Sequence, residues 1–231
     1  MFIIIPKVFQ EQGFESYRDI EKYVDHIKLN PKFLGKKLEI INKYAYEKSY
    51  YQSIKFLDIG CYIGLFLYHL DKENFFNELV GIDIEPEFIK IGKKVTESCQ
   101  KVVLLNKNLF DLDIDNKYDM IFMGELIEHL DNPKRYLEKV YELLNPDGIL
   151  IISTPSATGI TNILLNLKNR DLKYIEDEVR GVGSETDHYY CWDKLTLLRL
   201  CHSVGFRYVS HYTTNPFNVF KGQSIIMVLR K

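Results

Sequence analysis

The stretch FLDIGCYIG, residues 56–64, carries the residue types that a nucleoside-containing ligand requires. Asp58, Gly60 and Gly64 come after a short apolar segment at residues 54–57, which predicts a buried strand turning into a helix. Glycine lets such a turn bend sharply and lets a ligand approach the main chain, because it has no Cβ. About twenty residues later Asp83 ends a second apolar segment, where a carboxylate can bind ribose hydroxyls.

A second group of chemically capable residues lies in GELIEHLDNP, residues 124–133. If residues 125–129 form a helical turn, Glu125, Glu128 and His129 share one face after the apolar segment 118–123. Ligand sites in parallel sheets lie at this carboxyl end of the strands. We therefore expect His129 to be a general base with Glu128 beside it. In the alternative interpretation, both residues only cap and hydrogen-bond the loop that leads to Pro133.

Apolar segments alternate with amphipathic ones along most of the chain, which predicts an α/β fold with an open, doubly wound parallel sheet. We expect strands at residues 54–57, 79–84, 101–105, 118–123 and 149–153, then an antiparallel pair at 206–211 and 224–229. Helices are expected at residues 15–29, 33–48, 65–70, from Pro86, at 131–144 and at 192–204, with a turn at 145–148.

Three further segments complete the expected organisation. Residues 1–50 are predicted to form an N-terminal helical cap, and residues 51–231 the main domain. The stretch from about 155 to 187 breaks the rhythm and predicts an inserted lid. The tyrosines at 44, 46, 50 and 51 are expected either to pack beside the sheet or to line a substrate entrance.

Composition narrows the function classes. A chain of 231 residues that is 46% hydrophobic can bury a sizeable core. Its net charge of -2 provides no electrostatic footprint for nucleic acid or anionic membrane, and no run approaches the ~20 apolar residues of a membrane span. The four cysteines lack metal-ligand spacing, which predicts reduced thiols and a cytoplasmic protein. No pattern indicates an oligomeric state.

Over residues 54–230 the sequence resembles the class I S-adenosylmethionine-dependent methyltransferases, especially the group that includes ubiquinone-biosynthesis O-methyltransferases. The resemblance implies a Rossmann-like sheet of seven strands with an antiparallel closing strand and helices on both faces. It implies that Asp58 orients the cofactor amino group, that Gly60 and Gly64 pass beside its methionine part, and that Asp83 binds its ribose. The other cofactor contacts that it implies are Cys61, Tyr62, Ile84, Asn108, Leu109 and Glu125.

Two residues depart from the family pattern. Tyr62 stands where the family most often has its middle glycine, so the loop must either avoid positive φ there or hold a strained tyrosine. Asn108 replaces the usual aspartate. The NAD fingerprint G-x-G-x-x-G is a poor match, because Tyr62 stands where its second glycine, after Gly60, would be.

The ExxEH segment together with His188 also resembles the metal-binding pattern of the small-RNA 3′-terminal 2′-O-methyltransferases. That resemblance implies that Mg²⁺ or another divalent ion is held by Glu125, Glu128, His129 and His188. Without a metal, the catalytic candidates are His129, Glu128 and His188, and a purely structural role for them is the remaining alternative.

The sequence therefore predicts an S-adenosylmethionine-dependent methyltransferase that transfers a methyl group to a small-molecule acceptor, at oxygen. An RNA 2′-O-methyltransferase is the alternative within the same chemistry, although the absence of a basic stripe argues against it. A non-catalytic methyltransferase-like binding protein is the alternative from another class.

Overall fold

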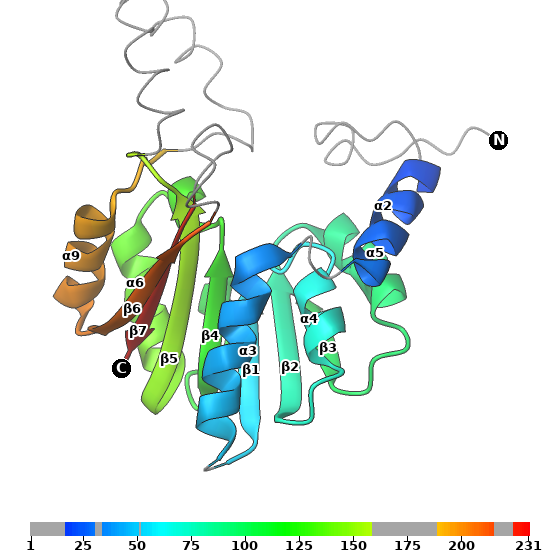
Figure 1. Cartoon of the computed structure of the whole chain (residues 1–231), viewed down its shortest axis with the longest axis horizontal. Helices are drawn as coiled ribbons and strands as arrows, with labels where there is room; N and C mark the ends of the chain where they lie inside the picture. The colour runs from blue at the N-terminus through cyan, green and yellow to red at the C-terminus, as the bar shows by residue number, and fades with distance from the viewer. Residues whose placement is uncertain (1–16, 31–33, 51, 159–188, 215–223) are drawn as a thin grey trace, which may run out of the picture. The chain divides into compact units, whose positions relative to one another are not determined.

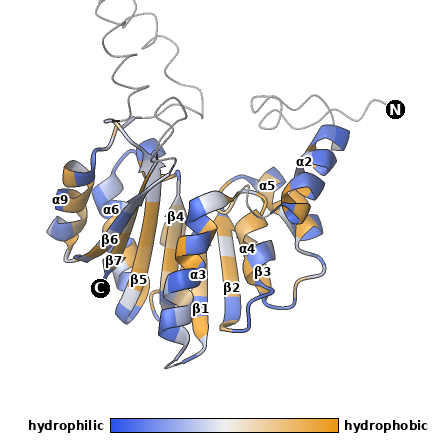
Figure 2. Cartoon of the chain, viewed as in Figure 1, coloured by the Kyte–Doolittle hydropathy of each residue, from blue (hydrophilic) through white to orange (hydrophobic). Residues whose placement is uncertain are grey.

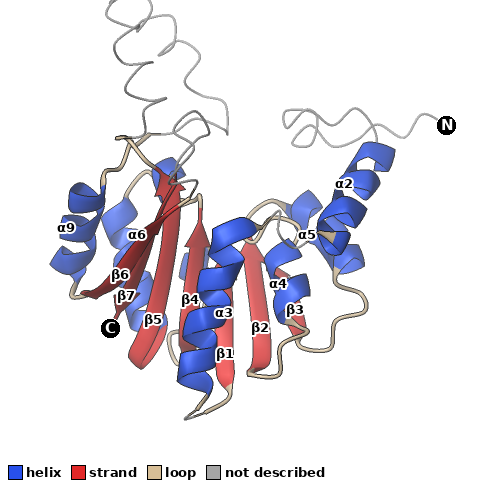
Figure 3. Ribbon diagram, viewed as in Figure 1, coloured by secondary structure: helices blue, strands red, loops and turns tan. Residues whose placement is uncertain are grey.

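The computed structural model describes residues 17–30, 34–50, 52–158, 189–214 and 224–231 (Figure 1). The chain divides into two compact units, Met1–Asn108 and Leu109–Lys231. Helices flank the strands in both units (Figure 3). The boundary expected at residue 50 remains a prediction. No helix among the described residues combines the length and the apolar character that crossing a bilayer requires.

The first unit contains a parallel three-stranded part of the sheet. Its strands lie in the order β3-β2-β1, and both neighbouring pairs run parallel. Its elements are helices α2 (Tyr17–Leu29), α3 (Gly35–Ser49), α4 (Leu65–Leu70) and α5 (Pro86–Val95), and strands β1 (Ile54–Ile59), β2 (Phe76–Asp83) and β3 (Val102–Asn106).

The second unit contributes four strands in the order β4-β5-β7-β6, of which β7 runs antiparallel to both neighbours. Its elements are η2 (Leu109–Asp111), β4 (Tyr118–Gly124), η3 (Ile127–His129), α6 (Pro133–Leu143), β5 (Leu144–Pro155), α9 (Lys194–Val204), β6 (Arg207–Thr213) and β7 (Ser224–Arg230). The described strands thus form one seven-stranded mixed sheet, and the expected Rossmann-like fold with its antiparallel closing strand is confirmed.

Hydropathy explains these elements. The strands other than β6 are mainly hydrophobic, whereas the helices carry both hydrophilic and hydrophobic residues (Figure 2). Strands buried on both faces read as nearly continuous apolar runs, and all but one residue of β4 is buried. Helices that cover a sheet need only one apolar face.

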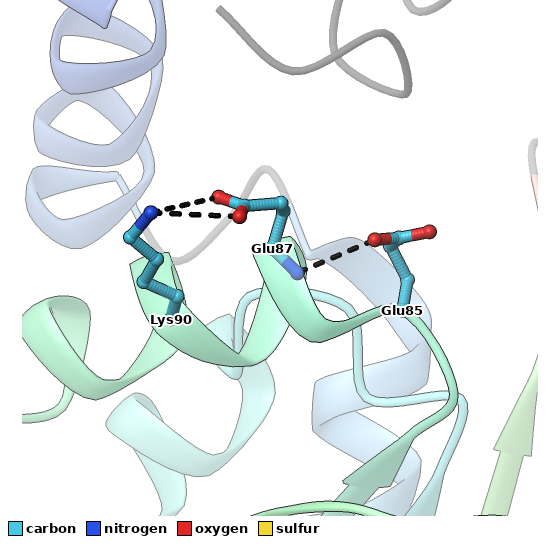
Figure 4. A network of polar contacts seen from close by, with 3 residues as sticks. All are labelled: Glu85, Glu87 and Lys90. Atoms are coloured by element: carbon cyan, nitrogen blue, oxygen red, sulfur yellow. Dashed lines mark hydrogen bonds and ion pairs between the residues drawn. The ribbon is translucent and has the colours of Figure 1, made fainter.

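Capping residues place the helix ends close to where the sequence predicts them. Helix α5 begins at Pro86, and the side chain of its cap, Glu85, accepts from the amide of Glu87 at 3.3 Å (Figure 4). Glu87 in turn is paired with Lys90 on the exposed face. Asn132 caps α6 in the same way, by accepting from an amide of the first turn.

Two expectations about local structure are wrong. The segment 145–148 is not a turn before the fifth strand but a bulge inside β5, because Tyr118 pairs with Leu144 while Met120 already pairs with Ile149. Asp58 belongs to β1 and does not follow it, because the strand continues to Ile59. The expected lid, residues 155–187, lies almost entirely outside the described residues.

Helix α2 packs on α4 and α5 through one apolar cluster, called here the α2 cluster. It consists of the buried residues Ile20, Val24, Ile27, Ile63, Leu65, Ile91 and Val95. A polar contact joins the same helices, because Nε2 of His69 in α4 donates to the carbonyl oxygen of Ile27 at 3.1 Å. Helix α2 is therefore anchored directly to the loop and helix that follow β1.

This anchor makes stability depend on pH. Burial lowers the pKa of His69, as does the charge of Lys72 to a smaller degree, although the hydrogen bond to Ile27 opposes both. The unfolded chain takes up a proton below about pH 6.5, and the folded chain does so only at lower pH, so His69 reduces stability as pH falls. We expect His69→Gln, which keeps a donor but does not titrate, to lose less stability than the wild type between pH 7.5 and 5.

Urea unfolding at a series of pH values measures this difference. His202→Gln, a substitution of an exposed histidine at the end of α9, is the matched control for the change from histidine to glutamine. Equal pH dependence in the wild type and His69→Gln would show that the buried imidazole does not couple α2 docking to pH.

Candidate functional site

The loop after β1 contains three residues with left-handed backbone. The φ angles are 71° at Gly60, 53° at Tyr62 and 72° at Gly64. The amides of Gly60 and Cys61 both donate to the carbonyl of Ile82 in β2, at 2.9 and 3.0 Å. The predicted glycine turn is therefore present, and it is bonded to the strand that ends on Asp83.

Gly64 serves this turn in two ways. It caps α4 at a φ that side chains rarely adopt, and a Cβ there would lie 3.2 Å from the side chain of Leu104 and 3.4 Å from that of Thr96. Tyr62 has a Cβ and is therefore strained in the same conformation. Of the two alternatives that the sequence left open, the loop holds a strained tyrosine and does not avoid positive φ.

The carboxylate of Asp83 is held by main-chain donors on both of its oxygens. The amide of Tyr62 donates to Oδ2 and the amide of Glu85 donates to Oδ1, each at 2.9 Å. Nδ2 of Asn106 in β3 donates to the carbonyl oxygens of Asp83 and Ile84, at 3.0 and 2.9 Å. A carboxylate oxygen has two lone pairs, so both oxygens keep acceptor capacity for the hydroxyls of a ligand.

Burial makes the ionised form of these acids unfavourable. Burial raises the pKa of Asp58 well above its usual range, and the nearby charge of Asp83 raises it further. Burial also raises the pKa of Asp83, although its hydrogen bonds from the amides of Glu85 and Tyr62 oppose that change. A ligand that carries positive charge or hydroxyl donors would stabilise both carboxylates.

The other predicted contacts differ in exposure. Cys61 is buried, and burial together with the charges of Asp58 and Asp83 raises the pKa of its thiol, which therefore stays neutral. The apolar side chain of Ile84 is 72% exposed directly after Asp83. Asn108 is half-buried, and Leu109, the first residue of the second unit, is buried.

In the second unit, Glu125 is fixed in an unusual conformation at the end of β4. Its φ is 50°, and its amide donates to the carbonyl of Ser153 at 2.8 Å. The hydroxyls of Ser153 in β5 and Ser224 in β7 donate to its two carboxylate oxygens at 2.9 and 3.4 Å. Strained residues cluster at functional sites because the surrounding structure holds them there.

The prediction of a helical turn at residues 125–129 is wrong about where the turn begins. The 3₁₀ turn η3 begins only at Ile127, because Glu125 has left-handed backbone. Glu128 is buried and accepts a hydrogen bond from Oγ1 of Thr154 at 2.9 Å, while the ring of His129 is half-buried. The helical spacing that predicted a common face for Glu125, Glu128 and His129 therefore does not apply.

The described members of the predicted metal set do not by themselves form a metal site. Among described residues no three His, Cys, Asp or Glu side chains are grouped as metal ligands would be. The oxygens of Glu125 and Glu128 instead accept hydroxyl donors. His188 lies outside the described residues, and the roles of all four residues stay predictions.

Sequence reasoning missed the residues that orient these acids: Glu85, Asn106, Ser153, Thr154 and Ser224. A signal existed for Asn106, because it ends the third apolar segment as Asp83 ends the second, and the two are paired in the sheet. For Ser153 and Thr154 the signal was two hydroxyls at the end of an apolar strand.

The sequence of the chain is similar to those of known methyltransferases. The chain is 32% identical over 115 residues to a ubiquinone biosynthesis O-methyltransferase of Rickettsia bellii, covering 48% of the chain and 47% of that protein. It is 25% identical over 154 residues to the mitochondrial ubiquinone biosynthesis O-methyltransferase of Dictyostelium discoideum, covering 59% of the chain and 48% of that protein. The chain thus spans about half the length of these relatives.

The fold has solved counterparts as well. The crystal structure of magnesium protoporphyrin IX methyltransferase from Synechocystis PCC 6803 with bound SAH superposes with a TM-score of 0.62 at 14% identity, covering 84% of this chain and 81% of that one. A family model described as a methyltransferase domain matches residues 10–211. With its glycine turn, its paired acids and its seven-stranded sheet, the chain therefore belongs to the methyltransferase-domain family and has the class I methyltransferase fold.

Proposed function

We propose that the protein is an S-adenosylmethionine-dependent methyltransferase that methylates an oxygen atom of a small-molecule acceptor. The observation that carries the proposal is the Asp83 carboxylate, held by the amides of Tyr62 and Glu85 at the open end of β2. It is the arrangement that binding of a ribose diol requires, on a loop built around left-handed Gly60 and Gly64.

The residues of the first unit fit the cofactor in charge and in polarity. S-adenosylmethionine carries a sulfonium, which supplies an activated methyl group, and an amino group that Asp58 would bind. A buried carboxylate with a raised pKa gains most from such a positively charged partner. The exposed side chain of Ile84 supplies an apolar surface directly beside the proposed ribose contact, as an adenine ring requires.

In the second unit, His129 is the proposed general base for the acceptor. A hydroxyl acceptor must lose its proton as the new bond forms, and a ring nitrogen of the half-buried His129 can accept it. Glu125 and Glu128 are held by hydroxyls from β5 and are proposed to shape the surroundings of that histidine. The names of the relatives, O-methyltransferases, support oxygen as the target. The proposal assigns no role to a metal ion, and the third prediction below tests this with EDTA and Mg²⁺.

The first prediction concerns Asp83. Replacing it by Asn places an amide nitrogen against one of the two main-chain donors, so we expect Asp83→Asn to weaken binding of S-adenosylhomocysteine at least tenfold, about 1.4 kcal/mol. Titration calorimetry measures the dissociation constant. Asp71→Asn is the matched control, because Asp71 also accepts two amides, those of Gln100 and Lys101, at the far end of α4. Equal affinities of the two variants would contradict the assignment.

The second prediction concerns Asp58. Its folded pKa is raised, so the folded state holds its proton to higher pH than the unfolded chain, and stability falls as pH rises through the folded pKa. Asp58→Asn removes this cost and should raise Tm at pH 8 by about 2–4 °C for each kcal/mol relieved, with a smaller gain at pH 5. The same variant should bind S-adenosylmethionine more weakly. A variant that is both less stable and unchanged in affinity would exclude the proposed role.

The third prediction concerns the acceptor step. We expect His129→Ala to lower kcat about 10²-fold or more while leaving the dissociation constant of S-adenosylhomocysteine within twofold. The assay is methyl transfer to a panel of phenols, sugars, carboxylates and a short RNA.

The same assay tests for a metal. Wild-type turnover should persist in EDTA, and its loss there, with restoration by Mg²⁺, would favour the metal alternative. Methylation of the RNA alone would favour the RNA 2′-O-methyltransferase.

A further inference from the structure

Tyr62 has a conformation that its own side chain does not favour. Its φ of 53° lies in the left-handed region, which is unfavourable for a residue with a Cβ. Gly60 and Gly64 adopt the same region at little cost. Other interactions must therefore hold Tyr62 in place, and the contacts of its ring can contribute to them.

The ring packs on helix α5 and on the α2 cluster. It lies edge-on to Phe88 of α5, with ring centroids 4.4 Å apart, and it is partly buried against the α2 cluster. Edge-to-face aromatic pairs are stabilising beyond the area that they bury. The contacts of the ring therefore offset the strain of the main chain, and loss of some of these contacts would shift that balance.

The main chain of Tyr62 connects these ring contacts to the carboxylate of Asp83. With Tyr62 in its left-handed conformation, its amide donates to Oδ2 of Asp83. The amide on the other oxygen belongs to Glu85, which caps α5 and does not depend on the loop. Relaxation of Tyr62 to negative φ would turn its amide and release one side of the carboxylate.

We propose that Tyr62 is a positioning residue that makes the orientation of Asp83 depend on the docking of helix α2. Docked α2 keeps the ring packed, the packed ring keeps the loop left-handed, and the loop amide keeps Asp83 aimed at the cofactor. By linkage, a ligand that requires the ordered carboxylate also stabilises the docked helix to the same extent. The identity of that ligand rests on the function proposed above, but the dependence of the loop on α2 does not.

The test uses the 231-residue chain and loosens α2 without substituting a residue of the loop. Val24→Ala removes two methyl groups from the buried face of α2, and Ile41→Ala on α3 is the control, because Ile41 is buried but lies outside the α2 cluster. We expect Val24→Ala to weaken S-adenosylhomocysteine binding about fivefold and Ile41→Ala to leave it within twofold.

A double-mutant comparison separates positioning from general stability. Glycine adopts positive φ without a packed ring, so Val24→Ala should no longer change affinity in a Tyr62→Gly background. Tyr62→Phe keeps the ring and should retain the fivefold effect. If Val24→Ala weakened binding equally in the wild type and in the Tyr62→Gly background, the proposal would be overturned, because the effect would then not pass through Tyr62.

Hydrogen exchange provides a ligand-free measurement. In the protein without ligand, Val24→Ala should increase amide exchange in the peptide that contains Tyr62 several-fold more than Ile41→Ala does. If this occurs but S-adenosylhomocysteine does not bind the wild type, the proposed function fails while the coupling stands. If exchange at Tyr62 is unchanged by Val24→Ala, the coupling fails, whatever the ligand.

Discussion

The carboxylate of Asp83 is the point on which the arrangement of the first unit depends. Its two oxygens accept amides from the two loops that follow β1 and β2, those of Tyr62 and Glu85. Asn106, at the end of β3, holds the main chain on the other side of the same residue. The side chain and the main chain of this one residue thus tie together the ends of three parallel strands, so the surface that a ligand meets is formed before the ligand arrives.

This arrangement is held against an electrostatic cost. Burial raises the pKa of both Asp58 and Asp83, and the charge of Asp83 raises the pKa of Asp58 further. A structure selected only for stability would place neutral residues there, whereas a site for a cation and a diol gains from two acids. In the second unit, Glu125 and Glu128 are oriented by hydroxyl groups of β5 instead of main-chain amides. Both units therefore orient their acids through the ends of neighbouring strands.

Most of the fold could be predicted from the sequence because its signals are local. Apolar runs marked the strands, and helix α4 begins and ends where the pattern placed it, at Leu65 and Leu70. Pro86 and Asn132 marked the starts of α5 and α6, because a proline or a capping side chain acts within one turn of the helix. The segment at 145–148 was misjudged because its turn residues form a bulge, and only pairing with β4 reveals that β5 already began at Leu144.

The candidate site was predictable in its residues but not in its contacts. Asp58, Gly60, Gly64 and Asp83 could be named because glycine and acid at strand ends have few other uses. The partners of the acids were missed, because they lie on other strands: the amide of Asn106 in β3 reaches the main chain of Asp83, and the hydroxyl of Ser224 in β7 reaches Glu125. Glu125 illustrates the same limit: helical spacing was assumed for it, but its bonds to Ser153 hold it in a left-handed conformation that ends the strand instead.

The sequence by itself determined the class of fold, the glycine turn and the acids beside it, because these follow from hydropathy period and from residue chemistry within a few positions. Only the tertiary structure decided the state of Tyr62. A tyrosine in place of a glycine leaves two outcomes open, a relaxed loop or a strained one, whose energies are similar. The strained loop is retained because the ring packs on Phe88 and on the α2 cluster, and the loop amide is bonded to Asp83.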